Sequence, residues 1–238
     1  MDIGRAFTYM FDDEKWVEKL VIGGLLVLAS IIPVVNLFTG LVVVGYTLRI
    51  LRRVSRGEEL PLPQWDDWGG DWVRGLMVAL GSLIYALPIL ILTGFSSVIG
   101  AIGGYEASGR AMEGVAGICT AVTSCLSALW GLVMAFVFPA ALINYAKEEE
   151  FASFFHFGEI FRFIGDNLGD YIVAVLLLIV ARLVGGLGVI VCGIGVFFTG
   201  FWAALVGVHL LGQVSAIDSS SPGEGAGDEL EPGMSGNV

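Results

Sequence analysis

Long stretches without any charged side chain alternate with short charged segments along the chain. The uncharged stretches cover residues 20–48, 75–105, 114–146 and, interrupted only by Arg182, 171–217. A helix needs about 20 consecutive apolar residues to cross the hydrocarbon core of a bilayer, whereas a buried helix of a soluble protein needs fewer. The pattern therefore predicts an all-α, polytopic transmembrane helical bundle.

The first uncharged stretch is too long for one helix that crosses the bilayer, and it is short for two such helices. Its 29 residues would form a helix of about 43 Å, against a hydrocarbon core of ~30 Å. The middle of the stretch reads Ile32-Pro33-Val34-Val35-Asn36. Proline disfavours a continuous helix, and asparagine readily supplies a turn. We therefore predict a helical hairpin with arms over 17–34 and 37–54, rather than one strongly tilted helix.

A stripe of arginines continues the second arm of this hairpin. Its members follow a spacing of i, i+3, i+4 and i+7, which places them on one helix face; they are Arg49, Arg52, Arg53 and Arg56. Long basic side chains can snorkel toward headgroups, so the stripe is a candidate contact for anionic lipid headgroups. Basic residues near helix ends mark the cytoplasmic side. The hairpin keeps Lys15 and Lys19 on the same side as the stripe, whereas a single crossing would separate them.

The remaining stretches predict four more helices, over 74–96, 114–143, 169–187 and 194–213. The last stretch contains Gly185-Gly186-Leu187-Gly188 and Cys192-Gly193-Ile194-Gly195, and either can host its turn. Six helices then form three hairpins in a membrane domain over 1–214, located in the cell membrane with both termini cytoplasmic. An aromatic, partly charged segment suited to the interface precedes each hairpin. Simple anchoring belts and a true threefold repeat both explain these segments.

The C-terminal segment 215–238 has a different composition. It contains five acidic residues together with Gly, Ser and Pro, and it has no basic residue. Such a segment cannot bury enough apolar surface to order itself. We predict an acidic, disordered cytoplasmic tail, which contributes part of the net charge of −11.

The most distinctive local string is EELPLPQWDDW at 58–68. Together with PVVN at 33–36 and GYTLR at 45–49, it resembles an uncharacterised, largely archaeal membrane family, domain of unknown function 4013. The resemblance covers residues 7–214, with the motifs concentrated in the first ninety residues. It implies a multi-pass membrane protein and supplies no activity.

The residues of this string suggest a strut followed by an interfacial segment. Two prolines extend the chain away from the arginine helix, and the segment Trp65, Asp66, Asp67 and Trp68 follows them. Its acids can meet the arginine stripe. A structural loop and a docking loop for a cytoplasmic partner are both compatible with this composition.

Residue patterns for catalysis or metal binding were not found. Cys119, Cys125 and Cys192 have no CxxC or Cys/His spacing, and His156 and His209 are interpreted as structural residues without an acidic partner at helical spacing. We therefore expect a protein that is not an enzyme and has no cofactor or metal. Nucleic acid is not an expected partner either, because the chain has no basic soluble domain.

Arg182 is the one charge inside an apolar stretch. An ionisable residue within a membrane is a functional-site hypothesis by default. Binding of an anionic lipid or substrate is one interpretation. Snorkelling to the outer interface, or a structural pair with Glu113, is the other.

The predicted features distinguish three kinds of function, of which a membrane enzyme has the weakest support because it needs a nucleophile, a metal set or an acid/base pair. A transporter needs polar groups near the midplane or broken helices, and the chain offers only Asn36, Arg182 and glycine breaks. An accessory or scaffold protein needs a packed bundle, a basic face for anionic lipids and exposed segments for partners. We therefore predict an accessory or scaffold protein that contacts the lipid bilayer and either a membrane protein partner or a second copy. A small-solute or lipid transporter is the alternative.

Overall fold

The structure is a computed structural model, and it describes residues 1–59, 62–106, 110–190 and 193–220. Within these residues the chain is helical, with short connections and no strand. In chain order the elements are α1 (Ile3–Thr8), the 3₁₀ turn η1 (Tyr9–Asp12), α2 (Trp16–Ala29), α3 (Pro33–Ser55), α4 (Trp68–Glu106), α5 (Arg110–Glu148), η2 (Phe151–Phe155), α6 (Phe157–Asp166), α7 (Leu168–Gly186), η3 (Leu187–Ile190) and α8 (Gly195–Ser220).

Five segments are long and apolar enough to cross a membrane by length and composition. They are Pro33–Ser55, Trp68–Val98, Gly117–Glu148, Leu168–Ile190 and Gly195–Asp218. The first predicted arm, 17–34, forms only the 14 residues of α2. A helix of that length rises about 21 Å, short of the ~30 Å hydrocarbon core. The all-α membrane bundle is confirmed, whereas the predicted count of six crossings is not.

The hairpin in the first uncharged stretch is present, but its turn lies earlier than predicted. Residues 30–32 form the turn, and Pro33 is the first residue of α3. Proline fits there because its missing N–H would have no partner within the helix. Asn36 lies inside α3, where its backbone N–H donates to the carbonyl of Ile32 at 2.8 Å. The two arms are joined near the turn by a hydrogen bond of 2.8 Å between the hydroxyls of Ser30 and Thr39.

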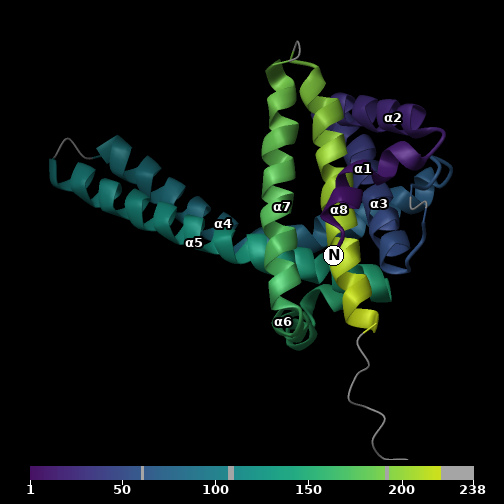
Figure 1. Cartoon of the computed structure of the whole chain (residues 1–238). Coiled ribbons are helices and arrows are strands. Elements are labelled where there is room, and N and C mark those ends of the chain that lie inside the picture. Colours follow the sequence, from purple (N-terminus) through teal and green to yellow (C-terminus); the bar gives the residue numbers. More distant parts are fainter. Residues whose placement is uncertain (60–61, 107–109, 191–192, 221–238) are drawn as a thin grey trace, which may run out of the picture.

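Helix α8 is the central element of the bundle, and α7, α3 and α2 all pack against it (Figure 1). Its contact with α2 depends on small residues. A Cβ added to Gly23 would lie 2.1 Å from the ring of Phe201, and one added to Gly24 would lie 2.2 Å from that of Phe198. The two glycines therefore make room for aromatic side chains of α8.

Helices α3 and α4 cross at backbone contact. A Cβ on Gly45 would lie 1.8 Å from the carbonyl oxygen of Asp71, and a Cβ on Gly75 would lie 1.9 Å from that of Leu41. This close approach brings Asp71 beside Arg49, which follows Gly45 by one helical turn. The crossing thus sets the position of the charged cluster described below.

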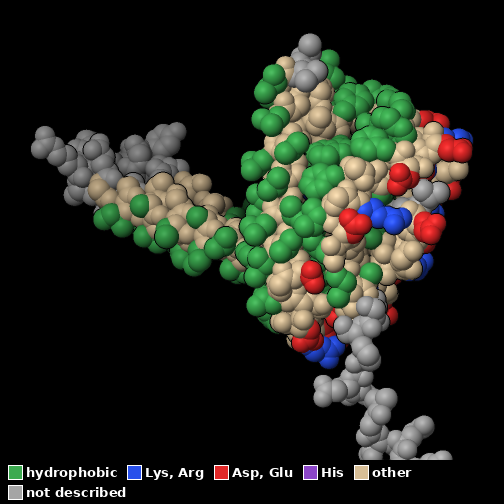
Figure 2. All heavy atoms as spheres, in the orientation of Figure 1, with side chains coloured by type: hydrophobic (Ala, Val, Ile, Leu, Met, Phe, Trp, Pro, Cys, Tyr) green, Lys and Arg blue, Asp and Glu red, His purple; other side chains and the backbone are tan. Residues whose placement is uncertain are grey.

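Helices α4 and α5 form a hairpin that projects sideways from α7 and α8 (Figure 1). Each helix has 39 residues, more than the predicted ranges 74–96 and 114–143. Figure 2 shows hydrophobic side chains over α7 and along this hairpin, with charged side chains gathered at the lower and right edges of the molecule. Exposed apolar side chains of this kind fit helices that are solvated by lipid.

The predicted boundaries at the C-terminal side are partly wrong. Both glycine clusters lie at the last turn, since α7 ends at Gly186 and α8 begins at Gly195, with Gly193 at a φ of +70° between them. Helix α8 continues to Ser220, so residues 215–220 belong to it and not to the tail. Within this extension the carboxylate of Asp218 accepts from Lys147 Nζ at 2.7 Å and from Asn167 Nδ2 at 3.1 Å. Residues 221–238 lie outside the described residues.

Candidate functional site

The arginine stripe at the end of α3 lines a cavity of about 200 Å³. The cavity is lined by Arg49, Arg52, Arg53, Arg56, Glu58 and Arg74. Four of these arginines come from the predicted stripe, and the fifth comes from α4, which crosses α3 at the glycine contact. The structure therefore adds Arg74 to the predicted set.

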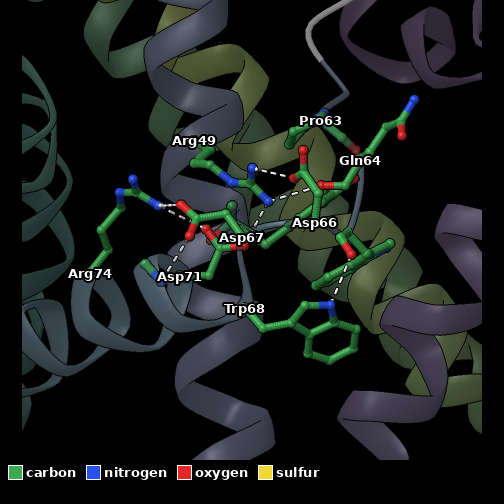
Figure 3. Close-up of polar contacts among 12 residues, drawn as sticks. Arg49, Pro63, Gln64, Asp66, Asp67, Trp68, Asp71 and Arg74 are labelled. Atoms are coloured by element: carbon green, nitrogen blue, oxygen red, sulfur yellow. Dashed lines mark hydrogen bonds and ion pairs between the residues drawn. The ribbon is translucent and has the colours of Figure 1, made fainter.

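A buried carboxylate holds the inner part of this cluster together (Figure 3). The side chain of Asp71 is 1% exposed, and it accepts from Arg49 Nη2 at 2.7 Å and from Arg74 Nη1 at 3.1 Å. Arg74 Nη1 also donates to Asp67 at 2.9 Å. A buried carboxylate with two guanidinium partners keeps its charge compensated. Asp71 thus fixes one arginine on each of the two crossing helices.

Arg49 has further acceptors in the segment that follows the two prolines (Figure 3). It donates to the Asp66 carboxylate at 3.0 Å and to the carbonyl of Gln64 at 2.9 Å. The acids of this segment therefore do meet the stripe. The hydrogen bond from Arg49 holds the pKa of Asp66 below its ordinary value, and those from Arg74 and the Gly70 amide do the same for the pKa of Asp67.

The outer arginines have weaker or more exposed partners. Arg52 pairs with Glu149, and Arg53 Nε lies 3.6 Å from Glu58. Arg56 is exposed and makes no ion pair within the described part of the chain. Glu149 has a left-handed φ of 57° directly after α5 ends, and its carboxylate pairs with Arg52 and lies 3.9 Å from Arg74 Nε.

The predicted docking loop is partly anchored to the bundle. Trp65 stacks on Tyr46 with ring centroids 3.8 Å apart, and its indole N–H donates to the carbonyl of Lys19 at 3.3 Å. The Tyr46 hydroxyl donates to the carbonyl of Pro63 at 2.9 Å. Asp66 and Trp68 remain exposed. The loop is therefore a fixed structural element that presents these two side chains outward.

Arg182 lies apart from the arginine cluster. Its side chain is exposed on α7, one turn before the end of that helix, and therefore lies near the start of α8. The arginine stripe lies at the end of α3, which packs against Gly212 near the opposite end of α8. Arg182 has no ion pair among the described residues. The side chain of its predicted partner Glu113 lies outside the described part of the structure.

A second group of side chains was missed by the sequence analysis. His156 Nδ1 lies 3.7 Å from a Glu148 carboxylate oxygen and 3.6 Å from one of Glu159. The expectation that His156 lacks an acidic partner at helical spacing is therefore wrong, because Glu159 follows it by three residues. That i, i+3 spacing was the available signal. Of the three cysteines, Cys119 and Cys125 are free thiols, and Cys192 lies outside the described residues.

The fold and the charged cluster define a multi-pass helical membrane protein with paired arginines at one end of its bundle. The chain belongs to the family described as Protein of unknown function (DUF4013), whose profile matches residues 26–211. This match confirms the resemblance noted from the motifs. No curated protein matches the chain, and no solved structure matches it either.

Proposed function

We propose that the protein is an accessory or scaffold protein of the membrane that holds anionic lipid headgroups at the arginine cavity. The observation that carries this proposal is the lining itself, which contains five arginines and one acidic residue, Glu58. Guanidinium groups bind phosphate through paired hydrogen bonds, so a cavity with several of them suits a phosphate monoester or diester. The cavity also lies at the end of α3, one of the five segments long enough to cross the membrane.

The five arginines divide into a structural and an available set. Arg49 and Arg74 are held by Asp71 and join α3 to α4, and Arg52 is paired with Glu149. Arg53 has only a half-exposed partner at 3.6 Å, and such a pair contributes about 0–1 kcal/mol. Arg56 has no ion pair among the described residues. A headgroup phosphate therefore has two arginines to bind without breaking the inner network.

The accessory role further rests on the surfaces that the fold leaves open. The projecting α4–α5 hairpin presents apolar side chains along the part whose side chains the structure describes (Figure 2), and the segment after the prolines presents Asp66 and Trp68. A membrane protein partner or a second copy would meet the hairpin within the bilayer, and a partner at the membrane surface would meet the two exposed side chains. These partner contacts are part of the proposal, and detecting a protein bound to the extracted chain would test them directly.

Native mass spectrometry of protein extracted gently from its own membranes tests the proposal. We expect bound anionic phospholipid on the wild type and a loss of most of it in the double variant Arg53→Gln/Arg56→Gln. Arg182→Gln is the matched control, because it removes an exposed arginine from another part of the membrane domain. Equal retention in the wild type and the double variant would reject the arginine cavity. Loss in Arg182→Gln alone would place the lipid at that residue instead.

A further inference from the structure

We propose that Glu148, His156 and Glu159 bind a divalent transition-metal ion of the Mn²⁺ to Zn²⁺ series. One ligand atom from each residue lies within 4.8 Å of the others. The imidazole Nδ1 lies 3.7 and 3.6 Å from the two carboxylates, which is close enough for attraction and too long for a hydrogen bond. This site is separate from the arginine cavity and does not depend on the proposed lipid contact.

The three side chains converge because of how the chain turns between α5 and α6. Glu148 is the last residue of α5, His156 immediately precedes α6, and Glu159 lies in the first turn of α6. A histidine and a glutamate three residues apart at a helix start lie on one face. Glu and His three residues apart also supply metal ligands in helical bundles, there in the order Glu-x-x-His and in the bundle core, whereas here His156 comes first and the site is at the surface.

The turn between the two helices is held by groups other than the ligands. Phe154 in η2 is fully buried and stacks on Tyr145 with ring centroids 4.5 Å apart. The Tyr85 hydroxyl donates to the carbonyl of Phe154 at 2.5 Å. The backbone around His156 is therefore set by the core, and the site does not need a metal in order to form.

Asn144 orients one of the ligands from the preceding turn of α5. Its amide nitrogen donates to the carbonyl of Ser153 at 3.0 Å and to a Glu159 carboxylate oxygen at 3.3 Å. Hydrogen bonds of this kind to metal-binding carboxylates fix their direction and tune their affinity. Metal-to-ligand distances are about 2.0–2.2 Å, so the three exposed side chains must close slightly around an ion.

The chemistry of the site indicates the class of metal. One imidazole nitrogen and two carboxylate oxygens suit Mn²⁺, Fe²⁺, Co²⁺ or Zn²⁺, whereas Ca²⁺ and Mg²⁺ prefer oxygen ligands alone. Glu148 and Glu159 also line a cavity of about 270 Å³, whose other charged lining residues are Lys147, Arg162, Asp166 and Asp218. An ion held by three protein ligands would keep positions open toward this cavity for water.

Titration of the metal-free full chain with Mn²⁺ tests the site. The protein carries no affinity tag and is purified in detergent with a chelator that is then removed, and free Mn²⁺ is followed by electron paramagnetic resonance. We expect one ion per wild-type chain and affinity at least about tenfold weaker in His156→Gln and in Glu159→Gln. Glu150→Gln is the control, because it removes a neighbouring exposed carboxylate outside the triad and should bind as the wild type does.

Two further readouts separate a built site from general attraction of cations to acidic groups. The bound Mn²⁺ should show coupling to a ¹⁴N nucleus in the wild type and none in His156→Gln. Zn²⁺ should displace it at roughly equal concentration, and Mg²⁺ should not. The proposal is overturned if the wild type binds no stoichiometric ion, if nitrogen coupling is missing, or if Glu150→Gln weakens binding as much as His156→Gln does.

Discussion

At the scale of single residues, Asp71 is the most buried charged residue in the part of the chain that the structure describes. Its buried carboxylate joins Arg49 of α3 to Arg74 of α4 (Figure 3). Removing one partner from a buried ion pair typically costs about 3–5 kcal/mol, and here both arginines reach solvent, so we expect about 3 kcal/mol for Asp71→Asn. The free energy of unfolding, measured by titration with a denaturing detergent, checks this value.

Asp66→Asn is the matched control for that substitution, because Asp66 also pairs with Arg49 but has an exposed side chain. Exposed ion pairs contribute little, so this variant should unfold as the wild type does. If the two variants were equally stable, Asp71 would not be the residue that joins the helices.

A second residue-scale prediction concerns pH and the pair of Asp13 with Lys19, whose charged atoms lie 2.5 Å apart. Burial raises the pKa of Asp13. Hydrogen bonds from Lys19 Nζ and the Lys15 amide, together with the charges of both lysines, outweigh this effect and hold the pKa below the ordinary value for an aspartate, 3.8. A carboxyl whose pKa is lower in the folded state stabilises the fold above its unfolded-state pKa and loses that effect as pH falls through the folded-state value.

The stability difference between the wild type and Asp13→Asn should therefore be constant near neutral pH and shrink as pH falls below about 3.8. Thermal unfolding midpoints recorded across this range in detergent provide the measurement. Asp12→Asn, in the same turn and without an ion pair among the described residues, should leave the unfolding midpoint near neutral pH unchanged. A difference that grows on acidification would contradict the assigned sign.

At the scale of elements, the α3–α4 crossing depends on Gly45 and Gly75. An added methyl group would meet backbone oxygen at 1.8 and 1.9 Å, and backbone cannot move aside as a flexible side chain can. Overpacking of this kind costs about 1–3 kcal/mol or more, so Gly45→Ala and Gly75→Ala should both lower the unfolding midpoint. Gly94→Ala on α4 has open space around it and should cause no such loss, which makes it the control.

The elements also show what could be predicted from sequence. Uncharged length and Pro33 were enough for the five long apolar helices and for the presence of the first hairpin, because they reflect bilayer thickness and backbone chemistry, but not for the length of α2 or the position of its turn. The predicted start of α4 was too late in the chain. The charges of Asp71 and Arg74 suggested a boundary, but the two residues pair with each other inside the helix. The meeting of His156 with Glu148 was unpredictable from spacing, because it depends on the fold of η2 between them. The arginine cavity was not predicted, because Arg74 joins it only through the crossing of α3 and α4 at Gly45 and Gly75, and no local sequence pattern indicates that crossing.

At the scale of the whole molecule, the N-terminal segment returns to the end of the last helix. The backbone N–H and C=O of Asp2 hydrogen-bond the Gln213 side chain at 2.7 and 2.9 Å, and Arg5 donates to the carbonyl of Glu59. Gly212 of α8 meets Val54 of α3 in the same region. The start of the chain, the end of α3 and the end of α8 therefore share one side, although α2 alone is too short for a full crossing.

This arrangement predicts how single cysteines will be labelled in intact cells, in a background without native cysteines. By the positive-inside rule we propose that the side with the arginine cluster is cytoplasmic. Glu14→Cys and Glu58→Cys should then react with an impermeant thiol reagent only after the cells are opened. Ile31→Cys, in the turn between α2 and α3, should react in intact cells. If Glu14→Cys instead behaved like Ile31→Cys, α2 would lie along one surface and the N-terminal segment would not return to the cytoplasmic side.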